Sequence, residues 1–259
     1  TASCQHKLGS AGAVHPLTAY VMGYIKHLLE IKGDCLCTLF GDEGASDSTD
    51  ANAQAEADTE AFSRNEVRRI LMALETNLEA KAEKAYKGAA ALGSVFLMNN
   101  VHHIVKSVKR MPKLVHLLGS DWLARQEAEV KEYRHAYRNT TWSKMVGMLR
   151  QLPPGGVSSL DTKAKKEIKD KFVEFNATVE SVHAVQSRWT VPDEDLRQRL
   201  RASVQKVLVP AYRDFVERHK NSNFSKNPAK YIKYTAEQVN GLLEDFFENR
   251  TTAMDSDRS

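Results

Sequence analysis

The chain has 259 residues, 42% of them hydrophobic, which is ordinary for a globular protein with a real core of one large or two small helical domains. No stretch reaches 18 consecutive apolar residues, which excludes a transmembrane helix. The net charge of +4 is uneven: residues 41–62 hold seven acids and no lysine or arginine, so the remainder carries about +11 and favours an anionic partner, namely a membrane surface, an acidic protein or nucleic acid.

The first forty residues predict one long helix behind a short lead-in. TASCQHKLGS contains neither a starting methionine nor an apolar signal segment, so we expect an excised C-terminal piece of a longer protein. Apolar residues then recur at steps of three and four, which predicts one buried stripe on a helix of about 25 residues. The members of this stripe are Leu17, Val21, Tyr24, Leu28, Ile31, Cys35 and Leu39.

The cysteines favour no disulfide framework and no metal site. Cys4, Cys35 and Cys37 form an odd, sparse set, which indicates a reducing compartment. The last two are spaced as a zinc pair, but no second cysteine or histidine pair stands at ligand spacing. We therefore expect them to be buried as small apolar residues, with no metal and no cofactor.

An acidic segment and several helices are expected between residues 42 and 150. Residues 42–58 are rich in Ala, Ser and Asp and cannot bury enough apolar surface, so we predict a disordered acidic loop. Ser63-Arg-Asn-Glu66 is a capping box, which predicts that a second long helix begins there. The expected helices are 63–108, bent at Gly88 and Gly93, then 112–118 between Pro112 and Gly119, 120–137 capped by Ser120, and 141–150.

A break at residues 151–160 divides the chain. QLPPGGVSSL holds two prolines and two glycines, which predicts one helical domain over residues 1–150 and a second, with a basic tip, over residues 151–259. In the second domain we expect a helix around residues 168–182 and another that begins with Pro192 at its first position. Pro210 falls inside the apolar pattern of that second helix and predicts a kink or short break.

The last helix opens with a second capping box, Thr235-Ala-Glu-Gln238. Strand alternation is absent throughout the sequence, so the predicted fold class is all-α. We expect antiparallel helical bundles stacked into an elongated rod.

The sequence contains no catalytic signature, and we predict that the chain is not an enzyme. It lacks a phosphate-binding loop, a nucleophile elbow, a zinc-protease helix and a calcium loop. His102 and His103 are adjacent, so on a helix they point about 100° apart and cannot share a metal. We interpret the lysine-rich run of residues 163–171 as a solvated helix face.

The candidate binding site is the basic segment of residues 218–233. Its five cations face the single acid Glu217, and they are Arg218, Lys220, Lys226, Lys230 and Lys233. Lys230 and Lys233 are three apart, so one helical turn would place them on one face. Each cation near an anionic leaflet contributes about 1 kcal/mol, so we predict weak lipid binding that works by avidity. A tip that is merely solvated is the alternative that composition leaves open.

Five blocks of the sequence resemble a known family. They are VHPLTAYVMGYI, VFLMNNVHHIVKSVK, LLGSDWLARQEAEVKEYRHAYRNTTWSKM, WTVPDEDLRQRLRASVQKVLVPAYRDF and KNPAKYIKYTAEQV. Together they are similar to the C-terminal part of the Exo-seventy subunit of the exocyst, and the VHPLT and LMNNVHHIV forms are similar to plant members.

The resemblance implies a function and partners. It implies a cytoplasmic subunit, peripheral at the inner face of the plasma membrane, that tethers secretory vesicles there in exocytosis by binding phosphoinositides and other exocyst subunits. It also implies that Lys230 and Lys233, in the KYIKY motif, contact lipid, with Lys226 beside them. The alternative is a protein-docking helical scaffold engaged in plant immunity, with small GTPases or pathogen effector proteins as partners. No nucleic acid is expected, because a reading helix and a stacking platform are lacking.

Overall fold

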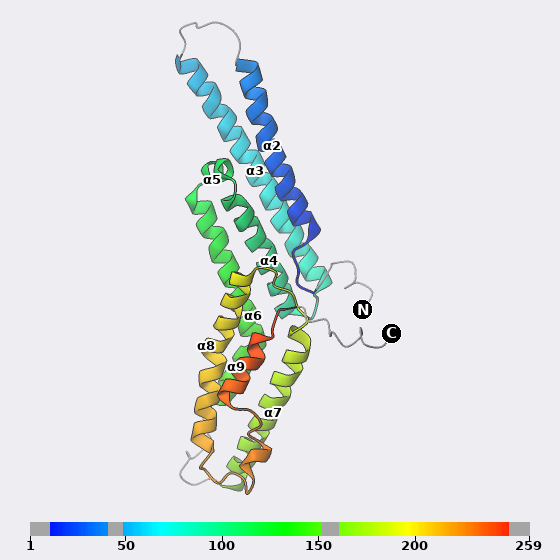
Figure 1. Ribbon diagram of the computed structural model, residues 1–259, viewed down its shortest axis with the longest axis vertical. Helices are drawn as coiled ribbons and strands as arrows, with labels where there is room; N and C mark the ends of the chain where they lie inside the picture. The colour runs from blue at the N-terminus through cyan, green and yellow to red at the C-terminus, as the bar shows by residue number, and fades with distance from the viewer. Residues whose placement is uncertain (1–10, 41–48, 152–160, 249–259) are drawn as a thin grey trace, which may run out of the picture. The chain divides into compact units, whose positions relative to one another are not determined.

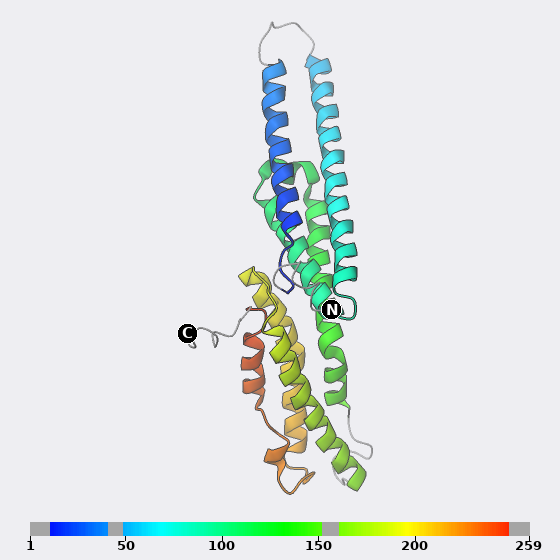
Figure 2. The ribbon, with the colours of Figure 1, turned by 90° about the vertical axis from the view of Figure 1, so that its right-hand side faces the viewer.

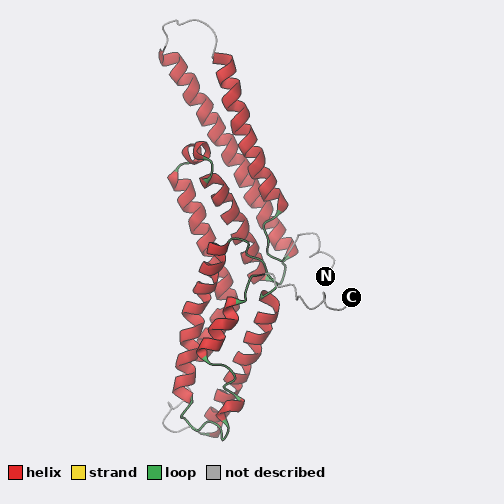
Figure 3. Cartoon of the chain, in the orientation of Figure 1, coloured by secondary structure: helices red, strands yellow, loops and turns green. Residues whose placement is uncertain are grey.

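The computed structural model describes residues 11–40, 49–151 and 161–248, apart from the side chains of residues 31–40 and 49–59 (Figure 1). Regular structure in these ranges is helical (Figure 3), so the predicted all-α fold class is confirmed. The elements are α2 (Pro16–Phe40), α3 (Thr49–Ala85), α4 (Ala90–Lys109), α5 (Pro112–Leu118), α6 (Ser120–Arg150), α7 (Thr162–Gln186), α8 (Glu194–His219), the 3-10 helix η1 (Pro228–Lys230) and α9 (Ala236–Glu244).

The chain divides into two compact units. Unit 1 comprises Thr1–Gly9, Val14–Gly88 and Phe96–Tyr133, and unit 2 comprises Ser10–Ala13, Ala89–Val95 and Arg134–Ser259. The helices α4 and α6 therefore contribute residues to both units. A domain boundary at residues 150 and 151 stays a prediction.

The helix α2 has the predicted length of 25 residues, but its buried stripe is not the predicted one. Thr18, Met22 and Ile25 are buried, whereas Tyr24 is 51% exposed. The apolar residues of this helix surround most of its circumference, so spacing alone could not select the buried face. The hydroxyl of Thr18 donates to Oδ1 of Asn100 at 2.6 Å, which makes a polar residue suitable for that face. The side chains of Cys35 and Cys37 lie outside the description.

The helix α3 begins at Thr49, which corrects two predictions. Residues 49–58 are helical rather than part of a disordered loop, and Ser63 lies inside the helix rather than at its start. The remainder of the predicted loop, residues 42–48, is not described. The physical reason is propensity: alanine, glutamine and glutamate alternate through residues 51–57, and these are strong helix formers despite their polarity.

Three further helix boundaries test the local rules. Gly88 adopts φ of 81° between α3 and α4, and Gly119 adopts φ of 83° after α5, as the prediction of a stop at Gly119 requires. The helix α6 runs unbroken from Ser120 to Arg150, so two separate helices were wrongly predicted there. Buried Tyr137 and Trp142 anchor the intervening turn, whose residues are weak helix formers.

The start of α8 and its proline also depart from expectation. Asp193 is the N-cap, and its carboxylate accepts from the backbone N–H of Leu196 at 3.0 Å, so Pro192 precedes the cap instead of opening the helix. The helix continues through Pro210 without a break. That proline is exposed, so the backbone carbonyl that loses its partner has access to water.

Aromatic side chains fill the core of unit 2. Phe175 stacks on Tyr212 with ring centroids 4.0 Å apart, and Phe172 contacts Phe215 at 4.6 Å, which joins α7 to α8. The helix α9 lies beside α8 in both views (Figures 1 and 2). Its capping box is present, since Thr235 and Gln238 exchange side-chain and backbone bonds as predicted. These contacts fix the connection between α8 and α9, where the candidate site lies.

Candidate lipid-binding surface

The connection from Lys220 to Thr235 is held along α7 by aromatic contacts. Phe224 is buried and stacks on Phe172 of α7, with centroids 5.5 Å apart. Tyr231 meets the edge of Phe224 at 6.0 Å, and the amide of Asn176 donates to the carbonyl of Tyr231 at 2.9 Å. The connection is thus fixed to a helix at two points, and its polar side chains stand on a defined backbone.

Two of the five predicted cations are available for a ligand. Lys226 and Lys230 are exposed, and their ammonium groups have no hydrogen bond or ion pair with another described residue. Lys230 ends η1, and Lys233 lies beyond that short helix, so the predicted common helix face for these two lysines is not formed.

Two more of the predicted cations are paired with carboxylates. Lys233 bonds Glu180 of α7 at 2.7 Å, and the hydroxyl of Tyr234 donates to the same carboxylate oxygen at 2.9 Å. These hydrogen bonds lower the pKa of Glu180, and the bond to Glu180 raises the pKa of Lys233. Lys220 pairs with Glu217 one turn earlier in the chain. Both pairs are exposed, so each contributes little stability but reduces the net positive charge.

The fifth predicted cation, Arg218, makes structural contacts. Its guanidinium donates to the carbonyl of Leu149 at 2.6 Å and to that of Asp214 at 3.1 Å, and it lies 5.8 Å from the ring centroid of Phe215. Carbonyls in the last turn of a helix lack partners within that helix, so Arg218 caps the end of α6. Lys171 does the same for Gln151 at 3.4 Å.

The structure adds four lysines that sequence reasoning set aside. The first turns of α7 and the connection lie at the same end of unit 2, where α8 also ends (Figures 1 and 2). Lys169 stands 5.8 Å from the ring centroid of Tyr231 and thereby joins the two groups. We name the combined surface the basic end, and its members are Lys163, Lys165, Lys166, Lys169, Lys226 and Lys230.

The signal for these lysines was present in the run KAKKEIKDK, but a helical run alone cannot show which segment lies beside it. None of the six members of the basic end forms an ion pair with a described carboxylate. The nearby Glu167 is paired with Lys171 at 2.9 Å. The members spread over two elements and do not converge on one pocket, so the surface is suited to a broad anionic surface rather than one small ligand.

Other chemistry was sought in the part of the chain that the structure describes. No group of three or more His, Cys, Asp or Glu side chains there could hold a metal ion. No helix in the described ranges is both long and apolar enough to cross a membrane. His102 and His103 are half-buried, and burial followed by the charge of Arg110 lowers the pKa of His103. The geometry is that of a helical binding scaffold.

Comparisons with known proteins agree with that class. The family that describes the C-terminal part of the Exo70 exocyst complex subunit matches residues 1–245. Exocyst complex component EXO70A1 of Arabidopsis thaliana is 39% identical over 248 residues, which cover 93% of this chain and 37% of the relative. Human exocyst complex component 7 is 26% identical over 251 residues, which cover 94% of this chain and 33% of that protein.

A solved structure of S. cerevisiae Exo70 has the same fold, with a TM-score of 0.66 at 20% identity, over 92% of this chain and 47% of that chain. The chain therefore spans less than half the length of these relatives. It belongs to the Exo70 family and matches the C-terminal part of its members, so the resemblance found in the sequence is confirmed. Exo70 exocyst subunits are non-catalytic tethering proteins, which confirms the prediction that the chain is not an enzyme.

Proposed function

We propose that this chain is the membrane-contacting part of an exocyst subunit that tethers secretory vesicles to the plasma membrane in exocytosis. Its basic end binds anionic phospholipids of the inner leaflet and holds the protein at that face of the membrane. The observation that carries the proposal is the gathering of six lysines without carboxylate partners among the described residues, from α7 and from the connection, at one end of unit 2.

The six lysines of the basic end carry the main role in this proposal. Glu180 and Glu217 partly neutralise Lys233 and Lys220, and Arg218 is engaged with backbone carbonyls. These three predicted residues therefore contribute less to lipid binding than Lys226 and Lys230. An exposed lysine near an anionic leaflet contributes about 1 kcal/mol, so several must act together.

Family membership supports other exocyst subunits as protein partners. The alternative function, a docking scaffold in plant immunity that binds small GTPases or pathogen effectors, stays a prediction.

Co-sedimentation with vesicles tests the lipid proposal. Vesicles of phosphatidylcholine with 5% phosphatidylinositol 4,5-bisphosphate are compared with pure phosphatidylcholine vesicles. We expect Lys226→Gln/Lys230→Gln to weaken binding roughly tenfold to thirtyfold, since two contacts of about 1 kcal/mol are lost. We expect Lys163→Gln/Lys166→Gln to have an effect of similar size, which would establish the α7 lysines as part of the surface.

The matched control removes the same charge elsewhere. Lys87 and Lys131 are exposed residues of unit 1, and Lys87→Gln/Lys131→Gln should bind vesicles within about twofold of the unsubstituted chain. Equal weakening by all three double variants would show that only net charge matters and would reject the basic end as a site. Unchanged binding by both basic-end variants would reject it as well.

A further inference from the structure

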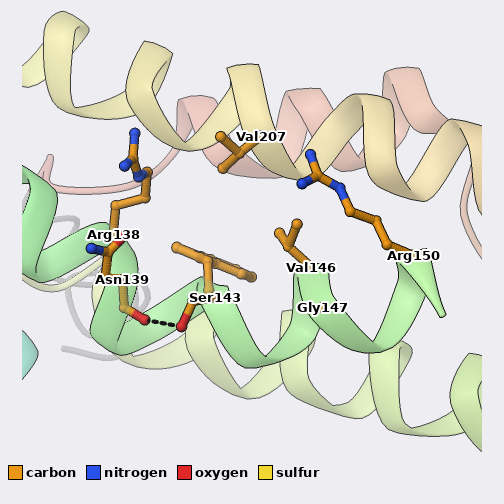
Figure 4. Close-up of a pocket in the computed structure, with 8 residues that line it drawn as sticks. Arg138, Asn139, Ser143, Val146, Gly147, Arg150 and Val207 are labelled. Carbon is orange, nitrogen blue, oxygen red and sulfur yellow. Dashed lines mark hydrogen bonds between the residues drawn. The ribbon is translucent and has the colours of Figure 1, made fainter.

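A groove in unit 2 lies between α6 and α8, away from the basic end's lysines in sequence, and has a volume of about 260 Å³ (Figure 4). The residues that line it are Arg138, Asn139, Trp142, Ser143, Val146, Gly147, Arg150 and Val207. Cavities that hold a drug-sized ligand begin at about 300 Å³, so this groove has room for one large side chain rather than for a cofactor.

The groove has an apolar floor between two cations. Arg138, Trp142, Val146 and Arg150 are spaced four apart and so lie along one face of α6. Trp142 is fully buried and Val146 is 7% exposed, so the floor is closed and apolar. In Figure 4, Arg138 and Arg150 extend toward α8 on either side of Val146 and Val207. Twelve residues of helix separate the two arginines, which is about 18 Å along the axis.

The middle of the groove is kept open by a glycine. Gly147 lies inside α6, where glycine costs roughly 1 kcal/mol relative to alanine. A Cβ atom at this position would meet nothing within 4 Å, so close packing does not require glycine here. A larger residue would stand in open space and fill the groove, and the absence of a side chain at residue 147 is what leaves room for a ligand.

The charges that face the groove have no counterpart within the described chain. Arg138 and Arg150 form no hydrogen bond or ion pair with another described residue, and no acid lines the groove. Next to Arg138, the Nε of Arg134 is buried without a hydrogen-bond partner. Burial, followed by the charges of Arg199 and Arg138, lowers the pKa of Arg134. Arginines therefore gather here in spite of their mutual repulsion, which favours an anionic occupant.

We propose that this groove binds an acidic segment of a partner protein. One large apolar side chain of that segment enters the groove over Val146 and Val207, and carboxylates on either side of it bond Arg138 and Arg150. An extended peptide covers about 18 Å in five or six residues. A flat leaflet is a poorer occupant because the apolar floor lies in a concave site, and nucleic acid is poorer because Trp142 is buried and offers no face for stacking.

Fluorescence anisotropy with the whole 259-residue chain tests this inference. The probe is a fluorescein-labelled octapeptide, Glu-Glu-Ala-Leu-Phe-Ala-Glu-Glu, at 50 mM salt. We expect a Kd on the order of tens of micromolar. Gly147→Phe fills the groove and Arg138→Gln/Arg150→Gln removes its cations, so each should weaken binding at least tenfold. The control variants Gly147→Ala and Lys226→Gln/Lys230→Gln should remain within about twofold.

Two altered peptides make the test independent of how the variants fold. Replacing the four glutamates with glutamine, or the Leu-Phe pair with alanine, should each abolish measurable binding to the unsubstituted chain. The inference is overturned if the original peptide does not bind, if Gly147→Phe binds it equally well, or if only the basic-end variant loses it. Loss of vesicle binding in Arg138→Gln/Arg150→Gln, without loss of peptide binding, would assign the groove to the membrane and also overturn it.

Discussion

At the scale of single residues, two ionisable side chains are buried without a charged partner of opposite sign. Glu75 of unit 1 has a buried Oε1 without a hydrogen-bond partner, and burial, followed by the charges of Glu129 and Glu79, raises its pKa to about 7. His219 of unit 2 is fully buried, with no hydrogen-bond partner at either ring nitrogen. Burial, followed by the charges of Arg218 and Lys171, lowers the pKa of His219 to about 4.

Glu75 makes the folded chain less stable as pH rises. Its folded pKa of about 7 lies above the ordinary 4.5, so the free energy of unfolding falls as pH rises from 4.5 through 7. Glu75→Gln removes this loss, and we expect it to be more stable than the unsubstituted chain by on the order of 2–3 kcal/mol at pH 8 and nearly equal at pH 4.5. Urea unfolding at both pH values measures the difference. Glu83→Gln, an exposed change of equal charge on α3, should show no such pH-dependent gain.

His219 has the opposite effect on the acid side. Its folded pKa of about 4 lies below the ordinary 6.5, so stability is intact above pH 6.5 and is lost as pH falls through 4. His219→Met keeps a similar volume and replaces two unpaired nitrogens with apolar atoms. We expect thermal unfolding at pH 4.5 to move to a higher temperature in this variant, with a smaller gain at pH 7. A gain that is equal at the two pH values, or that exposed His116→Met reproduces, would contradict this account.

At the scale of helices, one buried amide joins the start of α2 to α4. Oδ1 of Asn100 accepts from the backbone N–H of His15 at 2.9 Å and from the hydroxyl of Thr18 at 2.6 Å, and its Nδ2 donates to the carbonyl of Phe96 at 2.8 Å. His15 also accepts, through Nδ1, the N–H of Leu17 at 3.1 Å. The first N–H groups of α2 are therefore satisfied by side chains, which explains why the blocks VHPLT and LMNNVHH both hold polar residues in an apolar context.

Asn100→Ala should destabilise unit 1 by about 2–3 kcal/mol, because it leaves the N–H of His15 and the hydroxyl of Thr18 unpaired in the interior. Urea unfolding gives the magnitude, and hydrogen exchange should show the first turn of α2 opening more often. The control is Thr76→Ala, which removes an exposed side-chain bond to the carbonyl of Met72. If the two variants differ by less than about 0.5 kcal/mol, Asn100 does not anchor α2.

The same elements show how far sequence determines helix boundaries. Signals confined to one turn were predicted correctly, such as the glycine stop at Gly119 and the capping box at Thr235. Signals that depend on distant partners were not. The face of α2 that holds Tyr24 could not be assigned without knowing that Asn100 receives Thr18. The continuity of α6 depends on the burial of Tyr137 and Trp142, which local propensity does not include.

At the scale of the whole molecule, the net charge of +4 conceals a local concentration of lysines. The sequence was sufficient to select the segment of Lys226 and Lys230, because no acid lies between them. It could not reveal that Lys233 pairs with Glu180, or that the lysines of α7 share the same end of unit 2, since both depend on packing between elements far apart in the chain. The groove between α6 and α8 was missed for the same reason, because Val207 is distant in sequence from the residues of α6.

Vesicle binding through exposed lysines should depend strongly on salt. The members of the basic end are spread over two elements, so they act through the field of the whole surface, and the Debye length falls from about 14 Å at 50 mM salt to about 5 Å at 300 mM. We expect binding to vesicles with 5% phosphatidylinositol 4,5-bisphosphate to fall at least tenfold over this range, and the fall should be smaller for Lys226→Gln/Lys230→Gln because fewer charges remain to be screened. Gly147→Phe should bind these vesicles like the unsubstituted chain, since its groove has a separate ligand. Binding that is insensitive to salt would mean that apolar insertion, rather than the charge of the basic end, holds the chain on the membrane.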